Sequence, residues 1–437
     1  MGGDPADAQG RLGAVLQEAR EHERSGRAAL SERAYLRALE IDPAAVEALN
    51  AVAMAALSRG QAQRAFGLLQ QAERCDKENP LTQHNLGLAL SATGQLQAAG
   101  KALERAVAVE PGFAIAQLHL GRVREQLGDA HGALASYARA LALAHAENHW
   151  VDEASTPRGL LSLVRHAATT VVRGRRRWLA EALQPLRAHY GAAAFPRVDK
   201  CVDMYLGERE TAYPDPRQKP RFLYFPDLPA MPYFDTALFP WLADLERSAG
   251  EIRAELEQAM ARRSGFQPFL ELSENANVLD YLRAPDNRPT WDALFFYRHG
   301  ERFEQNHEDC PRTAAALHKL PLVRIREHAP EICFSLLTPG THILPHRGVT
   351  NTRVVAHLPL IVPPGCALNV GGIEHQWQEG RCVVFDDTFE HEAWNRGQGD
   401  RLVLIFDLWN PYLTDPEREA VTALVAAIGD LNRLCGK

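Results

Sequence analysis

The first third of the chain repeats its apolar and small residues with a period of 34 positions. Each unit carries a glycine, then a tyrosine or leucine nine residues later, then an alanine three residues after that. The four sets are Gly26, Tyr35 and Ala38; Gly60, Leu69 and Ala72; Gly94, Leu103 and Ala106; and Gly128, Tyr137 and Ala140. Such a period is typical of a helix-turn-helix repeat, since glycine permits the turn and alanine lets two helices approach closely. The pattern predicts an all-α solenoid of about four repeats over residues 10–147.

Residues 148–218 follow a different pattern. Apolar residues recur at helical spacing from Leu160 to Tyr190. Residues 211–220 are punctuated by prolines, which favour extended backbone in the residues before them. We therefore expect a helical connector and linker here, with the main domain boundary close to residue 218.

From residue 219 onward, most apolar residues fall in short runs that end at turns containing glycine or proline. The clearest runs are residues 332–337, 352–361, 367–370, 382–385 and 402–408. Short strands with such turns are typical of a β-sandwich or jelly roll. Two helices are expected beside them, one from about Pro240 to Arg262 and one that begins at Asp415. The chain is thus predicted to be a multidomain α + β protein.

Composition narrows the classes of function. The 437 residues carry a net charge of −7, which argues against a nucleic-acid-binding protein, because such proteins need a basic surface. The seven cysteines form no CxxC pair, which indicates reduced thiols rather than a disulfide framework. No run approaches the ~18 apolar residues of a membrane span, and the first residues lack the features of a signal peptide. We therefore expect a cytoplasmic protein with no membrane span.

Two histidines and an arginine stand where predicted strands begin or end. His346 and His391 each follow a predicted strand, and Arg401 opens the last one. Neutral imidazoles are suitable ligands for Fe(II), and an arginine can donate two parallel hydrogen bonds to a carboxylate. This layout is typical of oxygenases that use Fe(II) and 2-oxoglutarate. Such sites usually add a carboxylate two residues after the first histidine, but this position is Gly348, so spacing alone leaves the assignment open.

The sequence around these residues resembles the aspartyl/asparaginyl β-hydroxylase family. The matching strings are Pro-Gly-Thr-His-Ile-Leu-Pro-His-Arg-Gly-Val-Thr-Asn, His-Leu-Pro-Leu-Ile-Val-Pro-Pro-Gly-Cys and Val-Phe-Asp-Asp-Thr-Phe-Glu-His-Glu-Ala-Trp-Asn. The 34-residue units resemble tetratricopeptide repeats, which members of the family can carry before the oxygenase domain. The resemblance implies a double-stranded β-helix (jelly-roll or cupin-like) oxygenase domain with flanking helices over residues 219–437. It also implies Fe(II) as the cofactor, with 2-oxoglutarate and O2 as cosubstrates.

The resemblance further implies roles for individual residues. These are metal binding for His346 and His391, cosubstrate binding for Ser335, His357 and Arg401, and catalysis for His346, His391 and Arg401. The family is known for two histidine ligands without a carboxylate ligand, and Gly348 agrees with that pattern. Asp387 is the candidate carboxylate that would orient a metal ligand by hydrogen bonding.

Candidate substrate-binding residues are Arg298, Arg302 and Arg353. Arg353 alternates with Val355 and His357 along a predicted strand, so their three side chains share a face. Where this chain has Val355, a well-known animal member of the family has an arginine. The resemblance therefore does not extend to the substrate of that enzyme.

The expected activity is hydroxylation of a C–H bond in a peptide or protein that the repeats recruit. The resemblance implies the β-carbon of an aspartyl, asparaginyl or similar residue. A carrier-bound amino acid or a lipid acyl chain could be the substrate of the same chemistry, and a carrier protein would suit the repeats equally. A zinc hydrolase and a non-catalytic scaffold built on the repeats are competing hypotheses, of which the hydrolase would leave Arg401 without a role.

Overall fold

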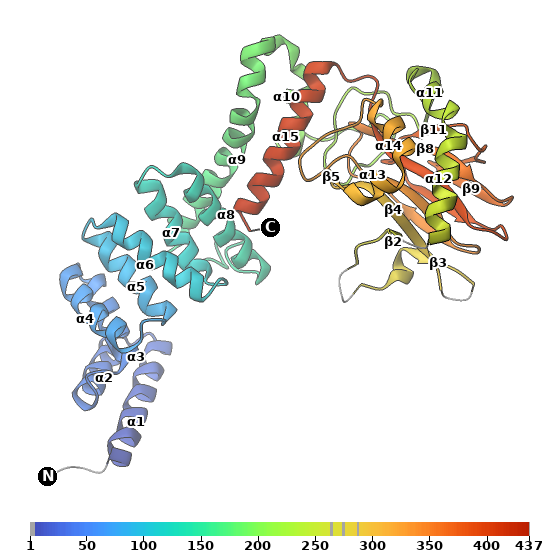
Figure 1. Ribbon diagram of the computed structural model, residues 1–437. Coiled ribbons are helices and arrows are strands. Elements are labelled where there is room, and N and C mark those ends of the chain that lie inside the picture. Colours follow the sequence, from blue (N-terminus) through green and yellow to red (C-terminus); the bar gives the residue numbers. More distant parts are fainter. Residues whose placement is uncertain (1–4, 263–264, 273–275, 286–287, 437) are drawn as a thin grey trace. The chain divides into compact units, whose positions relative to one another are not determined.

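The computed structural model describes residues 5–262, 265–272, 276–285 and 288–436 (Figure 1). The chain forms two compact units, Met1–Arg177 together with Leu431–Lys437, and Trp178–Asp430. This division falls inside one long helix, α9 (Leu161–Tyr190). The predicted domain limits at residues 147 and 218 follow sequence motifs rather than contacts, and they stay predictions.

The first unit contains the predicted repeats as pairs of helices. Their bounds are α1 (Pro5–Arg24), α2 (Ala28–Ile41), α3 (Val46–Ser58), α4 (Ala62–Cys75), α5 (Pro80–Ala92), α6 (Leu96–Val109), α7 (Ala114–Gln126) and α8 (Ala130–Ala146). Each glycine of the 34-residue period lies in the turn within a pair, with φ between +69° and +82°. Glycine adopts this conformation at little cost. The prediction of an all-α solenoid is confirmed.

Close packing within a pair depends on a second set of glycines. A Cβ on Gly121 in α7 would lie 2.5 Å from the ring of Tyr137 in α8. A Cβ on Gly87 in α5 would lie 2.6 Å from the side chain of Leu103 in α6. Tyr137 and Leu103 are fully buried. The large residue of each of these repeats therefore fills the space over a glycine of the preceding helix.

The second unit is built around two antiparallel sheets. The larger has the strand order β1-β11-β8-β13-β6-β4-β2, with β5 beside β4, and the smaller has the order β10-β9-β12-β7-β3. Their bounds are β1 (Tyr233–Phe234), β2 (Gln267–Pro268), β3 (Leu282–Arg283), β4 (Trp291–Arg298), β5 (Glu301–Arg302), β6 (Ile332–Leu337), β7 (His342–His346), β8 (Arg353–Ile361), β9 (Cys366–Val370), β10 (Ile373–His375), β11 (Val383–Phe385), β12 (His391–Asn395) and β13 (Arg401–Trp409). This arrangement confirms the predicted antiparallel β-domain.

An apolar layer lies between the two sheets. Leu337 and Phe385 of the larger sheet pack in one cluster with Leu368 and Val370 of the smaller sheet. Packing of two sheets through alternate inward side chains is the arrangement of a β-sandwich. The same inward positions can therefore line a cavity wherever the side chains leave space.

Helices cover the other face of the larger sheet (Figure 1). They are α11 (Leu242–Arg247), α12 (Ala249–Arg262), α13 (Glu304–Asp309) and α14 (Pro311–His318). The single helix expected from Pro240 to Arg262 is thus two helices that meet at Ser248. Helices α10 (Pro196–Tyr205) and α15 (Asp415–Leu434) complete the unit, and α15 begins at the predicted Asp415. Within the described ranges, no helix has the length and apolar character needed to cross a bilayer.

Candidate functional site

A cavity of about 240 Å³ opens within the second unit. Its lining combines side chains of both sheets: Phe269, Trp291, Glu331, Ser335, Ile343, His346, Gly348, Arg353, Val355, His357, Leu368, Phe385, Asp387, His391, Ala393, Arg401, Ile405 and Asp407. A cavity with an apolar wall and a few converging polar groups is the usual form of a small-molecule site. All the residues predicted to bind metal or cosubstrate lie in this lining.

The two predicted metal ligands are neighbours across adjacent strands. His391 of β12 and His346 of β7 are Cα partners, and their ring centroids are 4.1 Å apart. His346 Nδ1 lies 2.8 Å from Leu344 O, and His391 Nδ1 lies 3.1 Å from Phe389 O. A ring nitrogen that bonds to a carbonyl carries the proton, so Nε2 of each neutral ring has a free lone pair.

Both imidazoles are neutral at physiological pH. Burial lowers the pKa of His346, and it lowers the pKa of His391 to about 3, with a further contribution from the neighbouring His346. Removing a cation from water is costly, so burial favours the uncharged ring. Metal ligation requires that same uncharged form.

Many Fe(II) sites take a carboxylate from the residue two positions after the first histidine. In this chain that residue is Gly348, and the side chain of Asp387, from the connection between β11 and β12, lies beside it. A Cβ on Gly348 would lie 2.1 Å from the carboxyl carbon of Asp387. The backbone N–H of Gly348 donates to the carbonyl of Asp387 at 2.6 Å. Burial raises the pKa of Asp387 to about 7, and its Oδ1 has no hydrogen-bond partner among the described residues. Asp387 thus places a carboxyl group where residue 348 has no side chain.

The loop that carries Gly348 is held by a preceding extended segment. The backbone N–H of Arg221 donates to Gly348 O at 3.1 Å. The side chain of Asn351 accepts from Phe225 N at 2.7 Å and donates to Phe225 O at 2.8 Å. These bonds fix the backbone immediately after β7.

The described residues contain no group of three or more His, Cys, Asp or Glu side chains that could hold a metal, so the histidine pair has no third such partner there.

A buried cationic group lies elsewhere in the lining. Arg401 is 1% exposed, and its Nε and Nη1 have no hydrogen-bond partner in the described part of the chain. Burial lowers its pKa to about 10, and its guanidinium lies 5.1 Å from the ring centroid of Trp377. Buried Ser335 accepts a hydrogen bond from Trp291 Nε1 at 2.9 Å. Burial holds the pKa of His357 well below its usual value, with a further contribution from Arg401. This end of the cavity offers donors to an anion.

The three predicted substrate-binding arginines lie in different environments. Arg353 lines the cavity and forms an ion pair with Asp407. Arg298 is not in the lining, and its Nε lies 3.1 Å from a carboxylate oxygen of Glu271. Arg302 lies exposed on β5, away from the lining. The structure therefore brings only Arg353 into the cavity.

Sequence reasoning missed the lining residues Phe269, Trp291, Glu331 and Asp407. Alternation along β13 from Arg401 reaches Asp407, and alternation back from Ser335 reaches Glu331. The sequence therefore contained a pattern that could have identified Asp407 and Glu331. Phe269 and Trp291 form a stacked pair with centroids 3.8 Å apart and planes at 6°, and they come from segments whose pairing no local pattern indicates.

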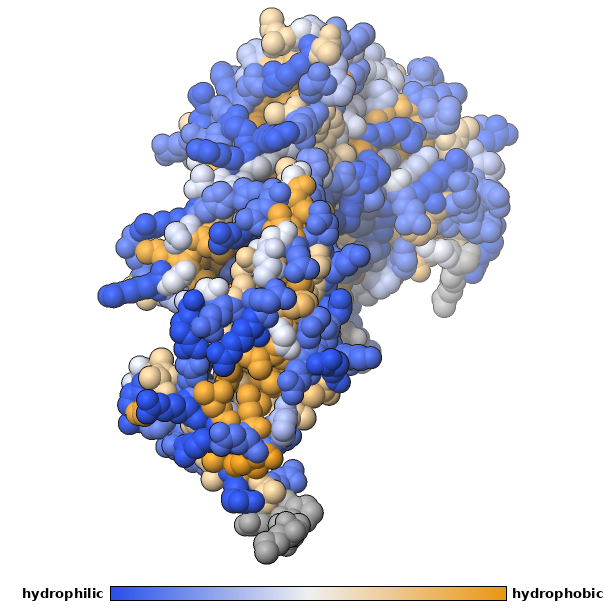
Figure 2. Space-filling view, turned by 90° about the vertical axis from the view of Figure 1, so that its left-hand side faces the viewer, coloured by the Kyte–Doolittle hydropathy of each residue, from blue (hydrophilic) through white to orange (hydrophobic). Residues whose placement is uncertain are grey.

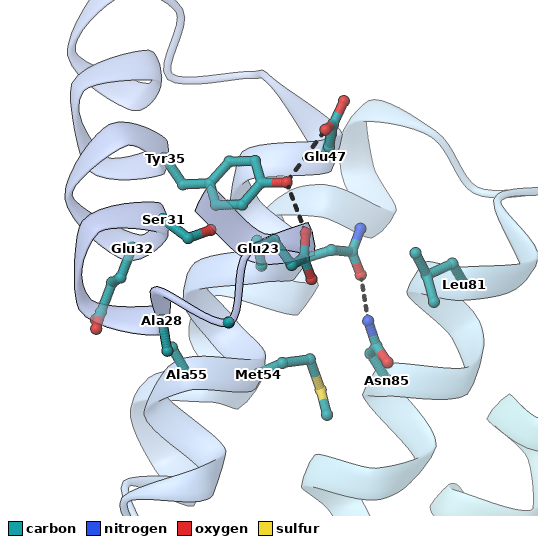
Figure 3. A pocket seen from close by; sticks show the side chains of 13 residues that line it. Glu23, Ala28, Ser31, Glu32, Tyr35, Glu47, Met54, Ala55, Leu81 and Asn85 are labelled. Atoms are coloured by element: carbon teal, nitrogen blue, oxygen red, sulfur yellow. Dashed lines mark hydrogen bonds between the residues drawn. The ribbon is translucent and has the colours of Figure 1, made fainter. Parts of the chain in front are cut away.

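A second cavity, of about 500 Å³, lies among the repeat helices α1, α2, α3 and α5 (Figure 3). The hydroxyl of Tyr35 lies 3.2 Å from a carboxylate oxygen of Glu23 and 3.3 Å from one of Glu47. Asn85 Nδ2 donates to Asn50 Oδ1 at 2.9 Å. Figure 2 shows apolar surface exposed between hydrophilic side chains over the repeats. The repeat surface thus presents both hydrogen-bonding and apolar groups.

Part of the second unit is similar in sequence to known proteins. Residues 246–411 match the aspartyl/asparaginyl β-hydroxylase family. Aspartate β-hydroxylase domain-containing protein 2 from Mus musculus is 31% identical over 252 residues, which cover 56% of this chain and 69% of that protein. This chain belongs to the aspartyl/asparaginyl β-hydroxylase family. Residues 82–113 match the tetratricopeptide repeat.

Further members of the hydroxylase family are also similar. Ornithine lipid ester-linked acyl 2-hydroxylase from Rhizobium tropici is 38% identical over 197 residues, which cover 44% of this chain and 66% of that protein. Human aspartyl/asparaginyl β-hydroxylase is 32% identical over 201 residues, which cover 45% of this chain and 25% of that protein. The match thus spans just under two-thirds of the first and a quarter of the second. The family-matched segment of this chain lies wholly within the second unit.

Proposed function

We propose that this protein is an Fe(II)- and 2-oxoglutarate-dependent dioxygenase that hydroxylates a C–H bond of its substrate. The observation that carries the proposal is one cavity that holds both a neutral histidine pair and a buried arginine with unused donors. The histidines suit a divalent metal and the arginine suits a carboxylate, so the residues present fit both groups.

His346 and His391 would hold the Fe(II). Their Nδ1–H groups bond to backbone carbonyls, which fixes each ring and leaves each Nε2 available. Asp387 lies beside the same loop and would orient its neighbours by hydrogen bonding. When bound, the metal supplies O2 activation, coupled to conversion of 2-oxoglutarate into succinate and CO2.

Arg401, Ser335 and His357 would hold the 2-oxoglutarate. Arg401 would donate from its unused Nη1 group to the distal carboxylate. The site is buried, so little water competes and each charge-assisted bond is strengthened. Ser335 already accepts from Trp291, and its own hydroxyl proton remains available to donate to the same carboxylate.

The substrate class that we propose is a peptide or protein recruited by the repeats, with an Asp, Asn or similar residue oxidised at its β-carbon. The repeat cavity of Figure 3 supports recruitment, because amides, carboxylates and apolar side chains line it together. A carrier-bound amino acid or a lipid acyl chain is the second candidate. The similarity to a protein named as an ornithine lipid acyl hydroxylase favours the lipid form.

The proposal is tested by reconstituting the full chain with Fe(II) and 2-oxoglutarate without oxygen and then admitting O2. We expect succinate to form only after O2 is admitted, and we expect peptides or lipids from a cell extract to gain one oxygen atom. His391→Ala should abolish both products. His318→Ala, which changes an exposed histidine of α14, is the matched control and should retain both. Protein that binds the metal and 2-oxoglutarate but forms no succinate with such an extract would contradict the proposal.

The same experiment distinguishes a dioxygenase from a zinc hydrolase and from a scaffold. A zinc hydrolase would contain zinc after anaerobic purification and would not consume 2-oxoglutarate, because a hydrolytic zinc site needs only an activated water. A non-catalytic scaffold would bind partners through the repeats but show no cosubstrate turnover. Metal analysis of the anaerobically purified protein distinguishes iron from zinc.

A further inference from the structure

The cavity has a second end, remote from Arg401. Arg401 and Asp407 both line it from β13, six residues apart on one strand face. At ~3.3 Å per residue, their backbones are roughly 20 Å apart. If Arg401 holds the cosubstrate, the Asp407 end is the part of the cavity left for the substrate. The inference therefore rests on the proposed function and concerns its substrate.

Arg353 is the cation at this end, and it is already paired. Its guanidinium contacts the carboxylate of Asp407, which also accepts from Glu331 N at 3.0 Å. Asp407 is 2% exposed, and the side chain of Arg353 is 18% exposed. The Nη1 group of Arg353 is therefore committed within the protein and is not free for a substrate carboxylate.

Carboxylates outnumber cations around this pair. Asp407, Asp387 and Glu331 all stabilise the charge of Arg353, which is the one cation among the described residues that line this end. The nearby Arg298 is paired with Glu271, and the ring of His299 lies between Glu271 and Glu331. This end of the lining thus carries more carboxyl groups than cations, and burial raises the pKa of both Glu331 and Asp387.

One of these carboxylates also has an unused acceptor. Asp387 is 7% exposed, lines the cavity and has an Oδ1 with no hydrogen-bond partner among the described residues. A buried acceptor without a donor is costly, so it favours a ligand that brings an N–H or O–H group. Arg353 does not supply that bond, since its hydrogen bond goes to Asp407.

We infer that the Asp407 end of the cavity binds a cationic group of the substrate, an ammonium in the simplest case, and not a carboxylate. The acceptors are Glu331 and Asp387, with Asp407 held in place by Arg353. The substrate is therefore an amine-bearing molecule, such as a lysyl or ornithyl derivative.

The test compares two probes that differ in the charge of one side chain, N-octanoyl-lysinamide and the α-amide of N-octanoyl-glutamate. Binding to the full chain is measured by calorimetry without oxygen, in the presence of Fe(II) and 2-oxoglutarate. We expect the lysinamide to bind at least about tenfold more tightly, since close opposite charges in a desolvated site couple by more than ~1.4 kcal/mol. Glu331→Gln should reduce this preference, and Glu331→Lys should reverse it. Glu301→Gln, on the exposed strand β5, is the matched control and should retain it.

The outcomes separate this inference from the proposed function. Equal affinity, tighter binding of the glutamate probe, or no binding of either probe overturns the inference. Binding of Fe(II) and 2-oxoglutarate is recorded independently through the visible charge-transfer absorption of the complex. Loss of that absorption together with a retained lysinamide preference would contradict the cofactor assignment alone.

Discussion

The carboxyl carbon of Asp387 lies 2.1 Å from the point that a Cβ on Gly348 would occupy. Two atoms cannot share that space, so residue 348 has no side chain as long as Asp387 keeps its position. The carboxylate that many Fe(II) sites take from two residues after the first histidine is therefore excluded here by packing. Asp387 brings a carboxyl group to the same region from the loop between β11 and β12.

This contact predicts that Gly348→Ala destabilises the second unit. Overpacking of a buried position costs about 1–3 kcal/mol, because neighbouring atoms must shift. The free energy of unfolding is measured by urea denaturation followed by circular dichroism. Gly250→Ala in α12 is the control, since a Cβ there meets no atom within 4 Å, and it should be neutral or slightly stabilising.

A paired substitution tests the relationship directly. Gly348→Asp should be more destabilising than Gly348→Ala, and adding Asp387→Gly should restore much of the lost free energy of unfolding, because it empties the contested space. Additive effects of the two changes would show that Gly348 and Asp387 do not compete for it.

The histidine pair predicts a loss of metal in single variants. His346→Ala and His391→Ala each leave one imidazole, so the iron content after anaerobic loading should fall from stoichiometric to near zero. Atomic absorption on gel-filtered protein gives the measurement. His375→Ala is a suitable control because His375 lies on β10 outside the cavity lining. Retained iron in either ligand variant would contradict the assignment of that histidine.

Because the guanidinium of Arg401 is buried, replacing it should maintain or raise the thermal stability of the cosubstrate-free protein but remove the stabilisation by 2-oxoglutarate. Arg401→Met removes a buried charge whose Nε and Nη1 lack partners among the described residues, so the cosubstrate-free protein should unfold at the same or a higher temperature. The wild type should gain about 2.7 kcal/mol from 2-oxoglutarate at a hundredfold excess over its Kd. The variant should gain almost nothing. Thermal melts with and without 2-oxoglutarate measure both effects, with exposed Arg302→Met as the control.

A histidine pair in the repeats predicts acid sensitivity of the first unit. His84 Nε2 and His119 Nδ1 are 2.9 Å apart, and burial lowers the pKa of His84 to about 4 and that of His119 to about 3. Both values lie below the 6.5 of an unfolded histidine, so the unfolded chain takes up protons that the folded chain excludes. Stability is therefore full above pH 6.5 and falls as the pH decreases toward 4, by about 2 kcal/mol for each histidine at pH 5.

Urea denaturation at pH 7.5 and pH 5 measures this effect. His84→Gln should reduce the difference between the two pH values, because glutamine does not titrate. His149→Gln, with a side chain 64% exposed, should leave it unchanged. An equal pH dependence in His84→Gln and the wild type would contradict the role of the pair.

Local periodicity was enough to predict the repeats and the five strands β6, β8, β9, β11 and β13. The glycine, the tyrosine or leucine, and the alanine recur at a fixed spacing, so the turn at Gly94 followed from the sequence. The order of the strands did not follow, because β8 pairs with β11 and β13 and not with β7 and β9, its neighbours in the sequence. Such pairings depend on long-range contacts that no window of sequence contains.

The candidate site was likewise predictable only in part from the sequence. The strings around His346 and His391 indicated these two residues as candidate ligands, and the structure places them side by side. Arg302 was predicted to bind substrate, but the hairpin between β4 and β5 turns it away from the cavity lining. The pairing of Arg353 with Asp407 was invisible in the sequence, because it joins neighbouring strands whose residues are far apart along the chain.

The two histidines are partners in one antiparallel ladder, on β7 and β12. Their proximity is therefore set by the hydrogen-bonding register of two strands and is independent of the length of chain that joins them. Insertions in the loops between β8 and β11 would leave the pair intact, whereas a one-residue slip of β12 would turn His391 to the opposite face of the sheet. In relatives with longer or shorter connections, the counterpart of His391 is best located as the cross-strand neighbour of the counterpart of His346.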